Sequence, residues 1–480
     1  MKNRLLLLLI AGSLGAYTAQ AQDAPKEWTL QECVNTALEN NLRVMRSLYG
    51  VESAKINLLQ AKMAFLPTVS GFGAYGENFG RAINPVTNQF INRNSNTINA
   101  GASGSLTLFN GQRIQNTFRQ TNRDYEASNY DLAKSRNDVI INVVTIYTNV
   151  IFNKELFNNA TYQLNSSVQQ LDRIKKQVAA GSLPKSNELN QEATVATNEV
   201  NLINQENALN LSLLQLKQAM QLPASTPIDV QVPEISINDL VLDQDPEVIY
   251  EIAKQTMPEI KSAILKVESS RLALNASKGN LYPRLSFNAN AQSNYSSVSN
   301  TARTQTTGMT LGSTPIGEVG NTGTPVYAYE PVRTLIADSY NQRDQLKDNL
   351  YKSLSLQLTI PIFSGLQNRT AVQRAAVSKE LALISKKETE NTLRQAIETA
   401  YNDALAAGKT YVASQKQVNA REEAYRMNQQ RFEAGALSLV EFQISENDLY
   451  QSKTEFTRAK YNFIFKKKVL DFYQGKPIEF

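Results

Sequence analysis

The chain has 480 residues, of which 49 are lysine or arginine and 44 are aspartate or glutamate, with no histidine and a single cysteine. A formal net charge of +5 on a chain of this length does not favour a nucleic-acid partner. Without histidine the usual zinc, haem, Ser-His and Cys-His sites cannot form, so we expect a protein that is not an enzyme and that holds no metal or cofactor.

The N-terminal segment 1–21 has the order of a secretory signal peptide: two basic residues, an apolar run over residues 5–10, and small residues before the expected cleavage site. The mature chain is therefore expected to begin at Gln22. No later stretch holds the ~18 uninterrupted apolar residues of a membrane-spanning helix. Any membrane-spanning part is therefore expected to be built from strands.

Two helical segments are predicted at residues 30–66 and 247–282. Each ends at a proline, Pro67 or Pro283, which stops a helix and commits the chain to extended structure. Apolar and polar residues then alternate with the period of a strand. The predicted strands lie at 68–79, 98–108, 285–295 and 353–362.

The second, third and fourth predicted strands have one apolar face and one face of Asn, Gln, Ser and Thr, whereas the first is rich in glycine. In the second strand the apolar face holds Ile98, Ala100, Ala102, Leu106 and Leu108. Strands of ~10 residues with this pattern are typical of a barrel that faces lipid outside and water inside, although strands of a soluble sandwich also alternate. Four strands cannot close around water and open edges cannot face lipid, so the barrel must be shared between chains.

The link between the paired strands is longer in the second half of the chain. Its additional residues lie at about 299–348, a stretch rich in Gly, Thr, Ser, Pro and Tyr. Such a composition predicts a surface loop and no further domain. Because both halves enter the barrel from the helical side, we expect this loop outside the cell.

The chain repeats one pattern at an offset of 254 residues: Gly111 and Gly181 correspond to Gly365 and Gly435. Between these glycines, apolar residues recur at every seventh position, as in a coiled coil. They are Val143, Val150, Phe157, Leu164, Leu171 and Val178 in the first copy, and Ile397, Ala404, Tyr411, Val418, Tyr425 and Phe432 in the second. Each copy therefore predicts a long helical hairpin, with the second glycine in its turn.

Over nearly all of its mature length the chain resembles the TolC-like outer-membrane factor family. The motifs that carry the resemblance are Trp28-Thr29-Leu30, Ala37-Leu38-Glu39-Asn40-Asn41, Leu66-Pro67, Tyr282-Pro283, the two Phe-x-Gly strand exits and Arg431-Phe432-Glu433-Ala434-Gly435. The resemblance implies a mixed fold, a membrane β-barrel continuous with a long α-helical barrel. It also implies a homotrimer in which each chain contributes four membrane strands and two coiled-coil hairpins.

The resemblance further implies that the hairpin turns contact a periplasmic adaptor. In the family this contact uses a Val-Gly-Leu-like turn, and here the glycine is present while its neighbours are smaller. The implied docking residues are Gly181, Ser182, Leu183, Gly435, Ala436 and Leu437.

The family pore narrows at acidic residues six and nine positions after the second turn glycine. Glu441 holds the first of these positions and Ile444 the second, whereas in the first repeat Asn187 is followed by Glu188. Glu441 and Glu188 are therefore the candidate constriction residues. The alternative interpretation of both is a carboxylate that complements the dipole at a helix start.

The predicted organisation follows the repeats. In chain order it comprises a signal peptide (1–21), periplasmic helices (22–66), barrel strands (67–110), the first helical hairpin (111–222), an equatorial linker (223–246), periplasmic helices (247–282), barrel strands with a long extracellular loop (283–364), the second hairpin (365–473) and a C-terminal tail (474–480).

The function implied is a passive exit duct in the outer membrane of a Gram-negative bacterium. Its partners would be outer-membrane lipid, a periplasmic adaptor and an inner-membrane transporter of RND or ABC type, within a tripartite efflux system. Type I protein secretion is an alternative that the composition does not separate from efflux. A periplasmic adaptor is another alternative, but adaptors carry one hairpin and lack membrane strands.

Overall fold

The computed structural model describes residues 26–83, 90–233, 244–301, 303–336 and 340–476, so the predicted signal peptide lies outside the described residues. The chain divides into two compact units. The helical unit comprises residues 1–55, 123–267 and 381–480, and the sheet unit comprises residues 56–122 and 268–380.

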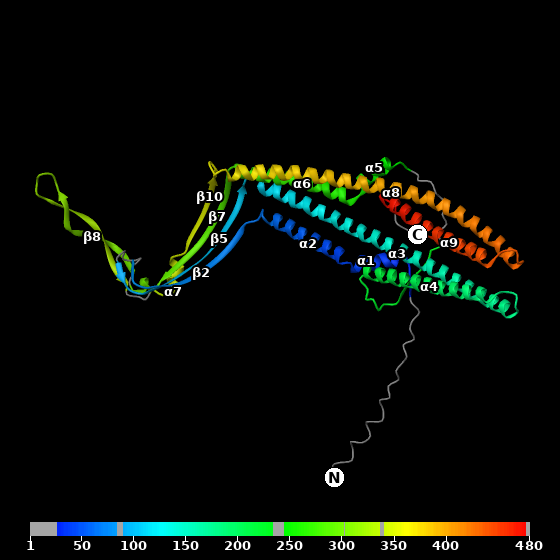
Figure 1. The fold of residues 1–480 in the computed structure, drawn as a ribbon. Helices are drawn as coiled ribbons and strands as arrows, with labels where there is room; N and C mark the ends of the chain where they lie inside the picture. The colour runs from blue at the N-terminus through cyan, green and yellow to red at the C-terminus, as the bar shows by residue number, and fades with distance from the viewer. Residues whose placement is uncertain (1–25, 84–89, 234–243, 302, 337–339, 477–480) are drawn as a thin grey trace, which may run out of the picture. The chain divides into compact units, whose positions relative to one another are not determined.

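The sheet unit is organised around one antiparallel sheet with the strand order β10-β7-β5-β2. Its strands are β2 (Thr68–Asn78), β5 (Ser95–Phe109), β7 (Arg284–Ser296) and β10 (Tyr351–Thr359). Figure 1 shows them side by side. Each one overlaps a strand predicted from the alternation, which confirms those four predictions.

The strand register gives this sheet one apolar and one polar face, because residues directly opposite each other share a face. One row crosses three strands from Leu356 to Phe287 and Leu106. The next row is polar: Ser355, Asn288 and Ser105. In that row the Ser105 hydroxyl donates to Asn288 Oδ1 at 3.0 Å. The predicted separation of apolar and polar side chains is therefore confirmed.

The regular register between β5 and β7 ends near Leu108. The register shifts between Thr107 and Phe109, so that Phe109 lies opposite Leu285. Leu108 is the extra residue of a β-bulge, which places two residues against one on the partner strand. A bulge leaves the sequence alternation unchanged up to that point, so the alternation could not reveal it.

The prediction of a loop at 299–348 is wrong in part, because its described residues contain regular structure. They include a two-stranded antiparallel hairpin of β8 (Arg303–Glu318) and β9 (Pro325–Ile336), a 3-10 turn at Ser297–Thr301, and helix α7 (Gln342–Asp348). The β-branched and aromatic residues among the glycines favour strands. In the shorter link of the first half, β3 (Arg81–Ile83) and β4 (Phe90–Asn92) form a smaller hairpin.

Each of the two predicted helical segments is divided. The first contains α1 (Leu30–Asn40) and α2 (Leu42–Met63), and the second contains α5 (Pro246–Thr256) and α6 (Pro258–Lys278), followed by a 3-10 turn at Gly279–Leu281. Asn41 and Met257 interrupt the helices with extended ψ angles of 122° and 130°. Met257 precedes Pro258, and the residue before a proline disfavours the helical conformation.

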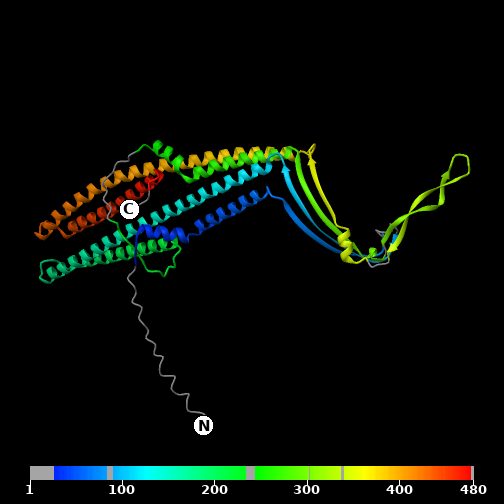
Figure 2. The same cartoon turned by 180° about the vertical axis from the view of Figure 1, so that it is seen from behind.

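The two long hairpins keep the repeat offset at every end. The first is α3 (Arg113–Ala179) with α4 (Lys185–Ala219), and the second is α8 (Gln367–Glu433) with α9 (Leu439–Tyr473). Each helix of the second hairpin begins and ends 254 residues after its counterpart in the first. Figures 1 and 2 both show α4 alongside α3 and α9 alongside α8. Within the described part of the chain, none of the helices combines the length and the apolar character required to cross a bilayer.

The core of the helical unit lies along the predicted heptads. Val143 and Val150 of α3, and Ile397 and Ala404 of α8, are each fully buried. A short parallel pair, β1 (Lys26–Trp28) and β6 (Ile228–Val230), lies in the same unit. Tyr147 joins α3 to this pair, since its hydroxyl donates to the carbonyl oxygens of Trp28 in β1 at 3.1 Å and of Gln231, the residue after β6, at 2.8 Å. The buried heptad residues of α3 and α8 therefore contribute to the core of both hairpins.

Candidate functional site

The turns of the two hairpins have the same backbone structure. Gly181 and Gly435 have φ angles of 77° and 73°, a conformation that only glycine adopts readily. Gly181 N donates to the Val178 carbonyl at 3.0 Å and Ser182 N to that of Gln177 at 2.9 Å. Gly435 and Ala436 make the equivalent bonds at 3.0 and 2.8 Å. Each turn is therefore a Schellman motif, which satisfies carbonyls at the helix end.

The turn residues implied as a docking site lie at the surface of the helical unit. Gly181, Ser182, Gly435 and Ala436 are exposed, and the leucine that follows in each turn is half-buried. The structure therefore leaves both turns accessible, with one apolar side chain beside each glycine.

Glu441 lies in the first turn of α9, where its carboxylate caps the helix. Glu441 Oε2 accepts from Ser438 N at 3.1 Å and from Ser438 Oγ at 2.8 Å, and Glu441 N donates back to Ser438 Oγ at 3.2 Å. This arrangement is a capping box. The hydrogen bonds from Ser438 hold the pKa of the Glu441 carboxyl below its usual range. The side chain is thus an exposed, ionised carboxylate close to the turn.

Glu188 has a different environment from Glu441. Its side chain is 11% exposed and pairs with Lys185 at 2.7 Å. At the position of Glu188 the second repeat has Phe442, which is buried and stacks on Phe432 with ring centroids 4.8 Å apart. Glu188 therefore lies on the side of α4 that packs inward, and its charge is partly neutralised by Lys185.

Polar side chains join the two hairpins within one chain. Gln443 of α9 donates from Nε2 to Gln191 Oε1 of α4 at 2.7 Å and to Thr194 Oγ1 at 3.3 Å. Ser166 of α3 donates to Glu446 Oε1 of α9 at 2.9 Å. Burial raises the pKa of Glu446, and the bond from Ser166 opposes that shift. The sequence alone does not reveal these residues, because polar positions on a long helix are typical of a solvated face.

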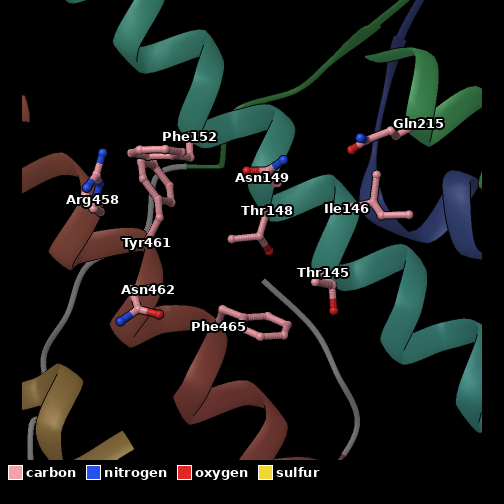
Figure 3. A pocket seen from close by; sticks show the side chains of 10 residues that line it. All are labelled: Thr145, Ile146, Thr148, Asn149, Phe152, Gln215, Arg458, Tyr461, Asn462 and Phe465. Carbon is pink, nitrogen blue, oxygen red and sulfur yellow. The ribbon is translucent and has the colours of Figure 1, made fainter. Parts of the chain in front are cut away.

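A cleft of about 570 Å³ is lined by residues of α3 and α9 and by Gln215 of α4. Figure 3 shows Thr148, Asn149 and Phe152 on α3 across from Tyr461 and Phe465 on α9. Among the described residues that line it, Arg458 alone is charged, and its guanidinium lies 5.9 Å from the Phe152 ring. Burial raises the pKa of Tyr461 to about 12, so its hydroxyl stays neutral at pH 7. The cleft offers rings, amides and hydroxyls for binding but no acid–base pair.

The described residues contain no group of three or more His, Cys, Asp or Glu side chains that could hold a metal ion. The candidate site comprises the two hairpin turns, the first turns of α4 and α9 with Glu188 and Glu441, and the polar contacts that join the hairpins.

Comparison with known proteins relates the chain to one protein family. The family model described as "Outer membrane efflux protein" matches residues 33–220 and 249–466. The curated protein "Proteases secretion protein PrtF" of Dickeya chrysanthemi is 19% identical and covers 97% of this chain, with 90% of its own length matched.

Solved structures share the fold. The CmeC outer membrane channel of Campylobacter jejuni has a TM-score of 0.71 and 17% identity, over 93% of this chain and 85% of that one. The outer membrane protein VceC of Vibrio cholerae has a TM-score of 0.73 and 10% identity, over 94% and 97%. The match therefore extends over both units of the chain.

Proposed function

The chain belongs to the outer membrane efflux protein family, and we propose that three copies of it assemble into the outer-membrane duct of a tripartite efflux system. The protein is an exit duct that conducts substrates across the outer membrane, with a periplasmic extension. The trimer, the twelve-stranded barrel, the adaptor docking site and the constriction are the proposed parts of this function.

The trimer is inferred from the two unpaired edges of the main sheet. Within the described residues, β2 pairs only with β5 and β10 only with β7. An unpaired strand edge cannot face lipid, because its N–H and C=O groups would have no partners. Pairing β2 of one copy with β10 of the next removes both edges, and closed cyclic symmetry then completes the barrel.

The oligomeric mass tests this proposal. We expect the full chain, extracted from outer membranes in a mild detergent, to have the mass of three copies by native mass spectrometry or light scattering. A stable monomer in the same detergent, with the sheet intact by circular dichroism, would contradict the shared barrel.

We infer that the two exposed turns dock the periplasmic adaptor, which couples the duct to an inner-membrane transporter of RND or ABC type. The matched backbone geometry at Gly181 and Gly435 supports a repeated contact with one partner. The half-buried Leu183 and Leu437 offer each contact a small apolar anchor.

Glu441 is the proposed constriction residue, because three copies near a common axis would form a ring of negative charge that attracts cations. We expect Glu441→Gln to alter single-channel conductance and to weaken cation selectivity in planar bilayers. Glutamine can still accept the capping bonds, so the change removes charge and leaves the helix start intact.

The matched control is Glu188→Gln, which we expect to change conductance less, because Glu188 is largely buried and already paired with Lys185. Unchanged conductance and selectivity in a normally assembled Glu441→Gln trimer would remove Glu441 from the pore. Its role would then be helix capping alone.

The PrtF relative favours protein secretion as the second candidate function, since that protein is named for secretion of proteases. To separate efflux from protein secretion, the native transporter is replaced by an efflux transporter in one strain and by a protein-secretion transporter in another. Dye efflux is measured in the first strain and release of a secreted protein in the second.

A further inference from the structure

The hairpin formed by β8 and β9 takes no part in the function proposed above. It consists of 16 and 12 residues. Within the described residues the two strands form a sheet of their own, with no third strand. Figure 1 shows this hairpin extending beyond the strands of the main sheet, within the same unit. An isolated two-stranded hairpin is marginally stable in water at best, so this one requires a further surface to pack against.

One face of the hairpin is apolar and uncharged at its centre, and we name it the Tyr329 face. It is defined by three pairs of directly opposed residues, which share a face: Met309 with Pro331, Leu311 with Tyr329, and Pro315 with Tyr327. Met309 is 68% exposed, Leu311 53% and Tyr329 69%. Large apolar side chains that are adjacent and this exposed mark an interaction surface more often than a solvated one.

Charged residues lie at the ends of the Tyr329 face and on the opposite face. Arg333, opposite Thr306, bounds one end, and Glu318, opposite Pro325, bounds the other. Glu330, opposite Thr310, lies at the centre of the other face. The two faces therefore differ at their centres, where one has Leu311 and Tyr329 and the other has Thr310 and Glu330. The Glu330 face also carries Val326 and Val332, which are less exposed, at 38% and 39%.

We propose that the Tyr329 faces of the three copies in one trimer meet about the trimer axis, so that each hairpin packs against the other two beyond the main sheet. The inference rests on the proposed trimer, which holds the copies at a high effective concentration. A contact of this kind buries the side chains that are exposed in the single chain, and it supplies the missing packing surface.

Charge and composition both fit a second copy. The strands contain two arginines and two glutamates, Arg303, Arg333, Glu318 and Glu330, so their net charge is zero and copies do not repel one another. Interfaces between identical chains are more apolar than other surfaces, with charged residues depleted at their centre. Tyrosine rings contribute large contact area at a low cost in conformational entropy. The Tyr329 face meets each of these requirements.

Cysteine cross-linking in the full-length protein tests the contact. The only native cysteine, Cys33, is fully buried, so it does not compete for the oxidant. We expect Tyr329→Cys to form a covalent dimer under mild oxidation, with two chains of each trimer joined. The matched control is Glu330→Cys, one residue further along the same strand and on the opposite face, which we expect to remain uncross-linked.

Serial dilution and native mass distinguish contact within one trimer from contact between trimers. Cross-linking that persists on serial dilution supports contact within one trimer. A loss on dilution means contact between separate trimers and contradicts the inference. An intact trimer in which Tyr329→Cys cross-links no better than Glu330→Cys also overturns it, because another partner must then cover the face, while the proposed function stands. Absence of any trimer would instead overturn the proposed function.

A second variant tests the same contact without cysteine chemistry. We expect Leu311→Glu to lower the temperature at which the trimer dissociates on a gel, because it places a carboxylate from each copy in the contact. Thr310→Gln, the adjacent residue on the opposite face, is the control and should leave that temperature unchanged, because it places no second carboxylate opposite Glu330. Equal temperatures for the two variants would contradict the proposed packing.

Discussion

Leu356→Arg should abolish assembly of the duct, whereas Ser355→Arg at the neighbouring position should be tolerated. Leu356 lies in the apolar row with Phe287 and Leu106, and Ser355 lies in the polar row with Asn288. In the proposed barrel the apolar face meets lipid and the polar face meets water. An arginine on the lipid face near the middle of a bilayer costs about 2–4 kcal/mol in each chain, and every chain of the trimer carries it.

The measurement is the amount of heat-resistant trimer in outer-membrane fractions, together with efflux of a fluorescent substrate. We expect Leu356→Arg to lose both and Ser355→Arg to keep the trimer while altering conductance. Because the two positions are adjacent in one strand, general effects of arginine on folding are matched. If both variants assembled equally well, the assignment of the apolar face to lipid would be wrong.

Phe463→Ala should strongly destabilise the second helical hairpin. Phe463 of α9 is 1% exposed, and its ring lies 6.0 Å from that of Tyr411 with an interplanar angle of 16°. Gly408 of α8 leaves room for this ring, since a Cβ at Gly408 would lie 3.2 Å from it. Removing a buried phenylalanine costs about 3–5 kcal/mol, because a cavity remains where the ring was.

Hydrogen exchange along α8 and α9 measures the effect of Phe463→Ala in the intact protein. The control is Phe465→Ala, which removes a half-buried ring at the cleft and should change exchange much less. Comparable exchange rates in both variants would show that the Tyr411 and Phe463 rings contribute little to the hairpin. The first hairpin, which has Leu209 at the position of Phe463, should be unaffected by Phe463→Ala.

The features predicted correctly from the sequence are those set by local chemistry. Glycines at the hairpin turns permit a positive φ, prolines end helices, and alternation assigns strand faces. Features that depend on contacts distant in sequence were missed or misplaced. The bulge at Leu108 appears only when β5 is aligned against β7, and the break at Asn41 has no proline to announce it.

The candidate site shows the same limit in its side chains. Glu192 and Glu446 hold equivalent positions in the two repeats, 254 residues apart. Glu192 pairs with Lys175 at 3.0 Å and is 42% exposed, whereas Glu446 is buried against Ser166 of the other hairpin. The repeat alone predicts the same environment for both. Only the packing of one hairpin against the other distinguishes them, and helix periodicity contains no information about that packing.

The matched helix lengths fix the register between the two hairpins. α3 and α8 each have 67 residues, and α4 and α9 each have 35. One residue added to α4 between its turn and Gln191 would advance the following residues by about 1.5 Å and rotate them by about 100°. Gln191 would then no longer meet Gln443, although no side chain had changed. The two halves of this chain can therefore differ widely in side chains, but a change of length in one requires the same change in the other.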